Sequence, residues 1–195
     1  MKRQRLSSDI RRKQILEATY KLVSQKGFKS VSTRSIAKDV GINEALIYKY
    51  FKKKENLLTA IVENLKTTRP KYNINLPDTE KDFFDALKEF EKFFLDLNCN
   101  DPAILKIILY AILENYPVPE EFNIDSKGTF LNWMLKSIEK GKSKWGFDQK
   151  VNKIEAICVF MGGLIYYVLE TSVINKIKRS KRNERFTELF FKVLK

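Results

Sequence analysis

Residues 32–54 read STRSIAKDVGINEALIYKYFKKK, and this stretch predicts two short helices joined by a glycine turn. Ser32 and Asn43 are residue types that favour the position before a helix, because their side-chain oxygens accept hydrogen bonds from free backbone N–H groups. Gly41 lies between the two segments, where a left-handed residue ends a helix at little steric cost. The stretch therefore predicts helix, turn and helix over about residues 32–51.

The apolar residues of this stretch recur at the spacing of amphipathic helices. The inward-facing positions are Ile36, Ala37 and Val40, followed by Leu46, Ile47 and Phe51. Two helices joined by a glycine-containing turn are typical of DNA-binding proteins that insert the second helix into the major groove. An ordinary helical hairpin has the same pattern.

The distribution of charge favours the DNA-binding interpretation. The chain has 195 residues, with 37 Lys and Arg against 24 Asp and Glu, a formal charge of +13. Residues 1–70 hold 17 of the basic and 6 of the acidic residues, so they carry +11 of this charge. Such asymmetry is expected of a phosphate-binding module attached to a nearly neutral body.

From about Asp9 to Arg69 the chain resembles the DNA-binding domain of the TetR family of bacterial and archaeal transcriptional regulators. The matching pieces are ILEATYKLVSQKGF, STRSIAKDVGI and LIYKYFKKKENLL. Within them the matching features are Gly27-Phe28, Ile36-Ala37, Gly41, the Tyr48-x-Tyr50-Phe51 run, and Lys54 followed by Glu55 and Leu57.

This resemblance implies two sets of DNA contacts. The expected phosphate contacts come from Ser32, Thr33, Tyr48, Tyr50 and Lys54, and the expected base contacts from Arg34, Asn43, Glu44, Ala45 and Lys49. Glu44 departs from the family pattern, which often has a small residue here. Three roles are open for it: reading a cytosine amino group, favouring the positive helix N-terminus, or excluding wrong sites.

Nothing in the sequence predicts an enzyme, a metal site or a cofactor. The chain contains no histidine, which is the commonest general base and metal ligand. Neither a glycine-rich phosphate loop nor a serine nucleophile motif is present. Carboxylate pairs such as Glu89 with Glu91, or Glu120 with Glu121, have the spacing of solvated positions.

Beyond Arg69 the sequence predicts a linker and then a helical body. The linker RPKYNINLPDTE contains two prolines and two asparagines. Amphipathic segments follow at about 79–97, 102–115, 126–145, 149–177 and 183–194, after a connecting helix at 55–66. The expected fold is all-α with about nine helices. Residues 1–69 would form a three-helix DNA-binding head, and residues 70–195 a bundle for ligand binding and dimerisation.

The body is rich in aromatic residues. Of the 24 Phe, Trp and Tyr residues, nineteen lie in 71–195. They are explained either as core packing or as the lining of an apolar ligand cavity. The candidate lining residues are Phe84, Phe90, Phe94, Tyr110, Ala111, Phe130, Trp133 and Tyr166. In the resembled family this body binds a small effector, and the composition suits a small lipophilic one such as a fatty acid, an acyl-CoA or an aromatic compound.

The last two predicted helices are the candidate dimer interface, as the resemblance implies. The expected contacts are Ile157, Met161, Gly162, Leu164, Val168, Phe186 and Phe190. Two adjacent glycines, Gly162 and Gly163, are costly in a helix. Either close approach of a partner helix or a kink beside the ligand pocket would account for them.

The sequence as a whole predicts a cytoplasmic regulator. The basic N-terminus is not followed by an apolar stretch, and the longest uncharged apolar run, 156–169, is too short to span a bilayer. Cys99 and Cys158 lack the spacing of metal or redox sites. The expected function is a homodimeric repressor of a palindromic double-stranded DNA operator, released by the effector and without a membrane partner. The alternative is control by a partner protein.

Overall fold

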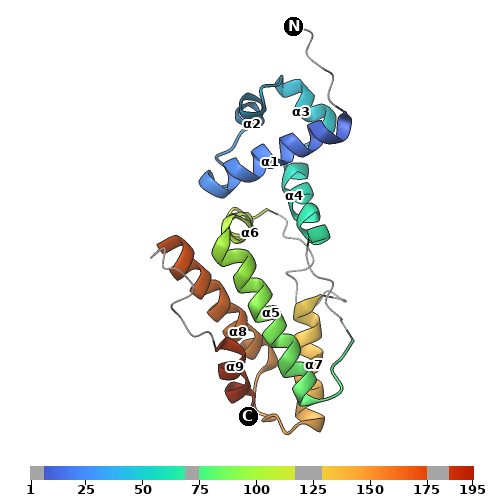
Figure 1. Cartoon of the computed structure of the whole chain (residues 1–195), viewed down its shortest axis with the longest axis vertical. Helices are drawn as coiled ribbons and strands as arrows, with labels where there is room; N and C mark the ends of the chain where they lie inside the picture. Colours follow the sequence, from blue (N-terminus) through green and yellow to red (C-terminus); the bar gives the residue numbers. More distant parts are fainter. Residues whose placement is uncertain (1–6, 69–74, 117–128, 175–184) are drawn as a thin grey trace. The chain divides into compact units, whose positions relative to one another are not determined.

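The computed structural model describes residues 7–68, 75–116, 129–174 and 185–195. These residues contain nine α-helices and no strand, which confirms the predicted all-α fold (Figure 1). The helices are α1 Ser8–Lys26, α2 Thr33–Val40, α3 Glu44–Tyr50, α4 Glu55–Thr68, α5 Glu80–Asn100, α6 Ala103–Leu113, α7 Phe130–Lys144, α8 Lys153–Val168 and α9 Phe186–Leu194.

The chain forms two compact units. The first contains Met1–Pro70 and Ala103–Pro119, and the second contains Lys71–Pro102 and Glu120–Lys195. Helix α6 groups with the N-terminal unit, although sequence order placed it in the predicted body. Much of the predicted linker at 69–80 lies outside the described residues.

The N-terminal unit is built around α1, whose inward face packs against α2, α4 and α6. Its core includes Ile15 and Val23 of α1, Ile36 of α2 and Ile47 of α3, each with 0% exposure. Helix α6 adds Ile107 and Ala111 to the same core. Ala111 was predicted to line a ligand cavity in the body. The structure instead places its side chain in the core of the N-terminal unit, with 3% exposure.

The C-terminal unit contains α5, α7, α8 and α9. Helix α5 packs against α8 and α9, and α7 packs against α8. The predicted helix at 149–177 begins only at Lys153, because the Asn152 side chain caps the N–H groups of Ile154 and Glu155. It continues beyond α8 as a π-helical segment, Leu169–Ile174.

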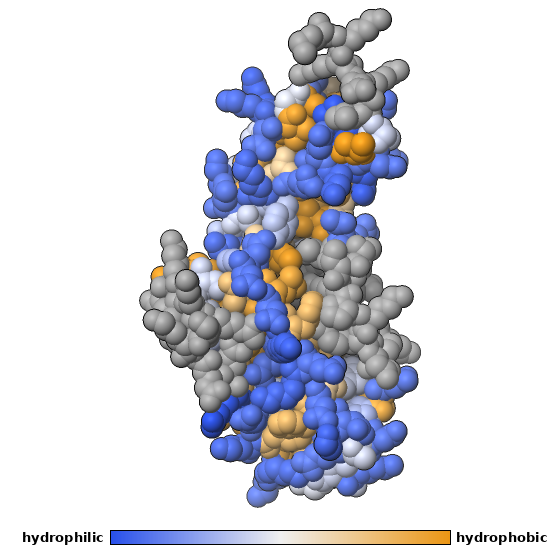
Figure 2. Space-filling view, in the orientation of Figure 1, coloured by the Kyte–Doolittle hydropathy of each residue, from blue (hydrophilic) through white to orange (hydrophobic). Residues whose placement is uncertain are grey.

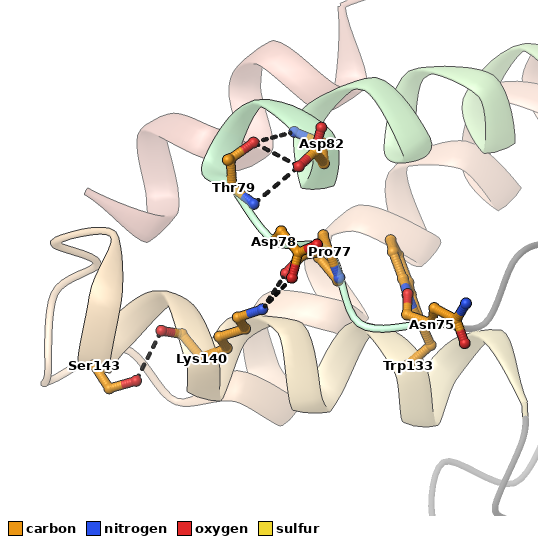
Figure 3. A network of polar contacts seen from close by, with 8 residues as sticks. All are labelled: Asn75, Pro77, Asp78, Thr79, Asp82, Trp133, Lys140 and Ser143. Atoms are coloured by element: carbon orange, nitrogen blue, oxygen red, sulfur yellow. Dashed lines mark hydrogen bonds and ion pairs between the residues drawn. The ribbon is translucent and has the colours of Figure 1, made fainter.

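A polar network anchors the start of α5 to α7 (Figure 3). The Thr79 hydroxyl accepts from the Asp82 N–H at 3.1 Å, and the Asp82 carboxylate accepts from the Thr79 N–H at 2.9 Å. Lys140 of α7 donates to the Pro77 carbonyl at 2.5 Å. The Trp133 indole N–H donates to the Asn75 carbonyl at 3.0 Å, so this tryptophan has a structural partner.

The described residues include one helix long and apolar enough to cross a membrane, Lys153–Ile174. A third of an 18-residue stretch of this helix is buried inside the protein. Core helices of soluble proteins can be equally long and apolar. In the view of Figure 2, hydrophilic residues surround smaller apolar areas over the described parts of the chain.

Candidate DNA-binding interface

The turn between α2 and α3 has the geometry that the sequence predicts. Ser32 Oγ accepts a hydrogen bond from the Ser35 N–H at 3.1 Å, and Asn43 Oδ1 accepts from the Ala45 N–H at 2.9 Å. Gly41 has φ 72° and ψ 38°, the left-handed conformation of a helix C-cap. The Ile42 N–H then closes the turn on the Ala37 carbonyl at 2.9 Å. Local caps therefore fix where α2 ends and α3 begins.

Buried side chains hold this pair of helices on the rest of the unit. Ile36 and Ala37 of α2 and Ile47 of α3 face inward, and Phe51 closes the end of α3 with 3% exposure. The Arg12 guanidinium lies over the Phe51 ring, 5.2 Å from its centroid. The opposite faces of α2 and α3 are left to solvent.

Most of the predicted DNA-contacting residues lie on these outer faces. Exposed residues are Ser32 and Arg34 at the start of α2, and Asn43, Ala45, Tyr48 and Lys49 around α3. Tyr50 is partly buried and packs against the core. Sequence reasoning left out Lys52 and Lys53, which are also exposed just after α3. The Lys52–Lys54 run was the signal that could have identified them.

Thr33 is the predicted contact that the structure buries, with 6% exposure. Its hydroxyl oxygen lies 2.5 Å from a carboxylate oxygen of Glu44 and 3.1 Å from the hydroxyl oxygen of Tyr48. These side chains tie α2 to α3. The prediction that Thr33 donates to a phosphate is therefore not supported, because its only hydrogen is held within the protein.

Lys54, which was predicted to contact a phosphate, instead makes its contacts within the protein. Its ammonium donates to the Phe28 carbonyl at 2.6 Å and lies over the Phe28 ring, 4.5 Å from the centroid. Burial lowers the pKa of Lys54, opposed by the nearby Glu114 and Glu55 carboxylates. Lys54 therefore connects the start of α4 to the turn that follows α1.

Glu114, which follows α6, holds the same turn through its carboxylate. This carboxylate accepts a hydrogen bond from the Lys29 N–H at 2.7 Å. One of its oxygens lies only 2.8 Å from the position that a Cβ on Gly27 would occupy. Tyr110 packs beside it, since its ring lies 3.3 Å from the same Cβ position. Tyr110 was predicted to bind a ligand, but here it helps to fix the N-terminal unit.

The aromatic residues of the C-terminal unit form packed layers. Phe90 and Phe130 stack with their ring centroids 3.7 Å apart, and Trp133 stacks on Phe130 at 5.3 Å. Phe94 lies 5.8 Å from Phe90, while Phe84 packs edge-on against Phe191 at 5.0 Å. Core packing thus accounts for these five predicted ligand-binding residues.

The remaining predicted ligand-binding residue, Tyr166, lies on the outside of α8. Its side chain is 65% exposed. An exposed ring does not line an internal cavity of its own protomer. Tyr166 is instead one of several exposed apolar residues of α8 and α9.

The predicted dimer interface also changes in the structure. Ile157, Leu164, Val168 and Phe190 have 0–3% exposure within the protomer, so they cannot reach a partner without repacking. Exposed apolar residues on the same two helices are Ile154, Val159, Tyr166, Leu189 and Val193, which we call the α8–α9 outer surface. Both faces of α8 are apolar, so the spacing of its apolar residues could not show which face packs inside the protomer and which is exposed.

The three other predicted interface residues are more exposed than the four buried ones. Met161 and Phe186 are partly exposed, and Gly162 is exposed with open space where a Cβ would stand. Gly163 is different, since a Cβ there would lie 3.2 Å from the Phe186 ring. Close packing of α9 accounts for Gly163, and Gly162 is left on the outer surface.

No group of His, Cys, Asp and Glu side chains that could hold a metal ion occurs in the described parts of the chain. Cys158 is exposed on α8, and Cys99 is partly buried with its sulfur 3.8 Å from the Thr171 hydroxyl. The helix-turn-helix surface is therefore the best-defined candidate site.

Comparison with known proteins agrees with this geometry. Residues 15–61 match the family model described as bacterial regulatory proteins, tetR family. The chain is 25% identical over 194 residues to the uncharacterized HTH-type transcriptional regulator YvkB of Bacillus subtilis, a match that covers 92% of this chain and 95% of that protein. It is 28% identical over 102 residues to the nucleoid occlusion factor SlmA of Mannheimia succiniciproducens. That match spans 50% of this chain and 46% of the relative.

A solved structure shows that the fold is shared. The crystal structure of a TetR family transcription regulator from Marinobacter aquaeolei superimposes with a TM-score of 0.68 at 20% identity, covering 95% of this chain and 94% of that one. The matched family model contains α2, the glycine turn and α3. The matched family model is of bacterial regulatory proteins, and the superimposed structure is of a transcription regulator. Over residues 15–61 the chain therefore matches the helix-turn-helix domain of TetR-family transcriptional regulators.

Proposed function

We propose that the protein binds an operator in double-stranded DNA by inserting α3 into the major groove. The observation that carries this proposal is the exposed outer face of α2 and α3, which presents Arg34 and Lys49 and is followed just after α3 by the exposed Lys52 and Lys53. The same part of the chain, residues 1–70, holds +11 of the +13 formal charge. Arg and Lys bind guanine edges and phosphates, so this face suits both specific and non-specific contacts.

Fluorescence anisotropy with labelled duplexes tests this proposal. Binding should weaken steeply with salt, because each neutralised phosphate releases counterions. The variant Lys49→Ala should reduce affinity or the salt slope, whereas Lys150→Ala, an exposed lysine of the C-terminal unit, should change neither. Equal effects of both substitutions would remove the basis for the assignment.

We further propose that the protein is a homodimer formed through the α8–α9 outer surface. Support comes from the exposure of Ile154 at 50%, Val159 at 58% and Tyr166 at 65% on α8, and of Leu189 at 56% on α9. Clustered exposed apolar residues mark interaction surfaces. A two-fold dimer presents two recognition helices to half-sites about 34–36 Å apart, so a pseudo-palindromic operator is expected.

We propose that the dimer acts as a cytoplasmic repressor released by a small lipophilic effector bound in the C-terminal unit. Support for an apolar ligand comes from the composition of this part of the chain, because residues 71–195 hold nineteen of the 24 aromatic residues. A panel of fatty acids, acyl-CoAs and aromatic compounds, scored by release from DNA, tests this step. The effector must bind the released state more tightly, by about 4 kcal/mol for a thousandfold effect.

Control by a partner protein is the second candidate. The similarity to proteins named nucleoid occlusion factor SlmA favours a protein partner. If no compound of the panel releases the protein from DNA while a cellular protein does, this second mode of control replaces the effector.

A further inference from the structure

A chain of hydrogen bonds at the start of the recognition helix has a fixed direction. Thr33 Oγ1 contacts both Glu44 Oε1, at 2.5 Å, and the Tyr48 hydroxyl, at 3.1 Å. A hydroxyl has one hydrogen to donate, and a carboxylate accepts without donating. Thr33 therefore donates to Glu44. Tyr48 then donates to Thr33, because the Thr33 oxygen has no second hydrogen.

This direction decides what the helix surface offers to DNA. The hydroxyl hydrogens of Thr33 and Tyr48 are both used within the protein. What remains for a ligand is the second carboxylate oxygen of Glu44 and the lone pairs of the Tyr48 hydroxyl, all of which are acceptors. Tyr48 is 48% exposed, so this acceptor edge reaches the surface. Phosphate oxygens are also acceptors, so they are poor partners for it.

The major groove contains only two kinds of hydrogen-bond donor, the amino groups of cytosine N4 and adenine N6. Carboxylates pair with cytosine N4, whereas the amide side chains of Asn and Gln pair with adenine. We propose that Glu44, held by Thr33, accepts a hydrogen bond from a cytosine amino group in each operator half-site. This inference rests on the proposed function, DNA binding through α3.

Anchoring by Thr33 is what makes Glu44 suitable for this role. A glutamate side chain loses rotamer freedom when it makes a specific contact. Thr33 is 6% exposed and belongs to α2, so its hydrogen bond fixes the Glu44 carboxylate before DNA binds. Arg34 and Lys49, which follow Thr33 and Tyr48 in the sequence, are exposed cations that attract the DNA backbone. Thr33 is therefore a positioning residue and Glu44 a specificity-determining one.

The experiment begins with selection of a preferred duplex by the full-length protein. Each cytosine of that duplex is then replaced in turn by 2-pyrimidinone deoxyribonucleoside, which keeps the ring but lacks the 4-amino group. Affinities are measured for the wild-type protein and for Glu44→Ala, Glu44→Gln and Thr33→Val. Thr59→Val, an exposed threonine of α4, is the matched control for removal of a hydroxyl.

One cytosine in each half-site should be sensitive in the wild type, with a loss of about 5- to 150-fold for its amino group, the range for one specific base contact. Glu44→Ala should be insensitive at that position, and Glu44→Gln should shift the preference there toward adenine. Thr33→Val should reduce the sensitivity to the cytosine amino group while the circular dichroism spectrum stays unchanged. Thr59→Val should keep the full sensitivity.

Two failures can be told apart. If a duplex is selected but every cytosine behaves the same in the wild type and in Glu44→Ala, Glu44 does not read the DNA and only ties α3 to α2. If no duplex is enriched and binding is absent for all proteins, the proposed function itself is wrong.

Discussion

Two charge substitutions on α8, two residues apart, should have opposite consequences for the protein. Leu164 has 0% exposure inside the protomer, and Tyr166 has 65% exposure on its outside. We expect Leu164→Glu to prevent folding of the C-terminal unit. We expect Tyr166→Glu to leave the protomer folded and to separate the proposed dimer.

The burial of each side chain determines how much its substitution should change the stability of the protomer and the strength of association. Truncating a buried leucine costs about 2–5 kcal/mol, and an unpaired buried carboxylate adds several kcal/mol. The total is comparable to the whole stability of a domain, about 5–15 kcal/mol. An exposed substitution changes protomer stability by only about 0.5 kcal/mol. A tyrosine at an interface contributes about 2 kcal/mol or more, and a two-fold dimer loses it twice, which weakens association roughly a thousandfold.

Sedimentation velocity and urea unfolding measure the two effects separately. Leu76→Glu, with Leu76 42% exposed before α5, is the matched control and should remain a folded dimer. The reasoning would be refuted if Tyr166→Glu sedimented as a dimer at the concentrations where the wild type does. A folded Leu164→Glu protein with wild-type stability would refute the burial argument.

Three further predictions concern contacts within the two units. Gly27 has φ 78° and ψ 158°, a conformation that costs other residues about 1–3 kcal/mol. Gly27→Ala should therefore lower the melting temperature. Gly162→Ala is the control and should not destabilise the protomer, because Gly162 is helical and has open space at its Cβ position. Glu91 is 4% exposed and accepts a hydrogen bond from the Thr187 N–H at 2.8 Å. Glu91→Ala should therefore lower the free energy of unfolding, measured with urea, by about 1–3 kcal/mol, and Glu91→Gln should lower it by less. Hydrogen bonds from the Thr79 hydroxyl and N–H lower the pKa of Asp82 below its usual 3.8, so this carboxylate should contribute stability above that pH and lose it as the pH falls through its folded pKa. Thr79→Val should raise the Asp82 pKa in an NMR titration, and an unchanged value would contradict the assignment.

The head could be predicted from the sequence because its determinants are local. The caps at Ser32 and Asn43 bond to backbone groups two or three residues away, and Gly41 adopts the left-handed conformation that its position implies. Six of the ten predicted DNA contacts are exposed around α2 and α3. The hydrogen bond from Thr33 to Glu44 was not predictable, because it joins two polar residues whose separation depends on the packing of α2 against α3.

The body was less predictable because its helices are apolar on more than one face. The pattern of α8 allowed Leu164 or Tyr166 to face inward, and only packing against α5, α7 and α9 decides between them. The position of Ala111 was missed for a related reason. Sequence order placed α6 in the body, whereas its side chains Ile107 and Ala111 complete the core of the N-terminal unit.

Selection of duplexes from a random library by the full-length protein tests the central claim most directly. We expect enrichment of an inverted repeat whose half-site centres are about 10–10.5 base pairs, or a multiple of this, apart. Arg34→Ala and Lys49→Ala should each relax the preference at one position of the half-site. Enrichment of no sequence above background, or a consensus that neither substitution alters, would contradict the claim that α3 and the start of α2 read the operator.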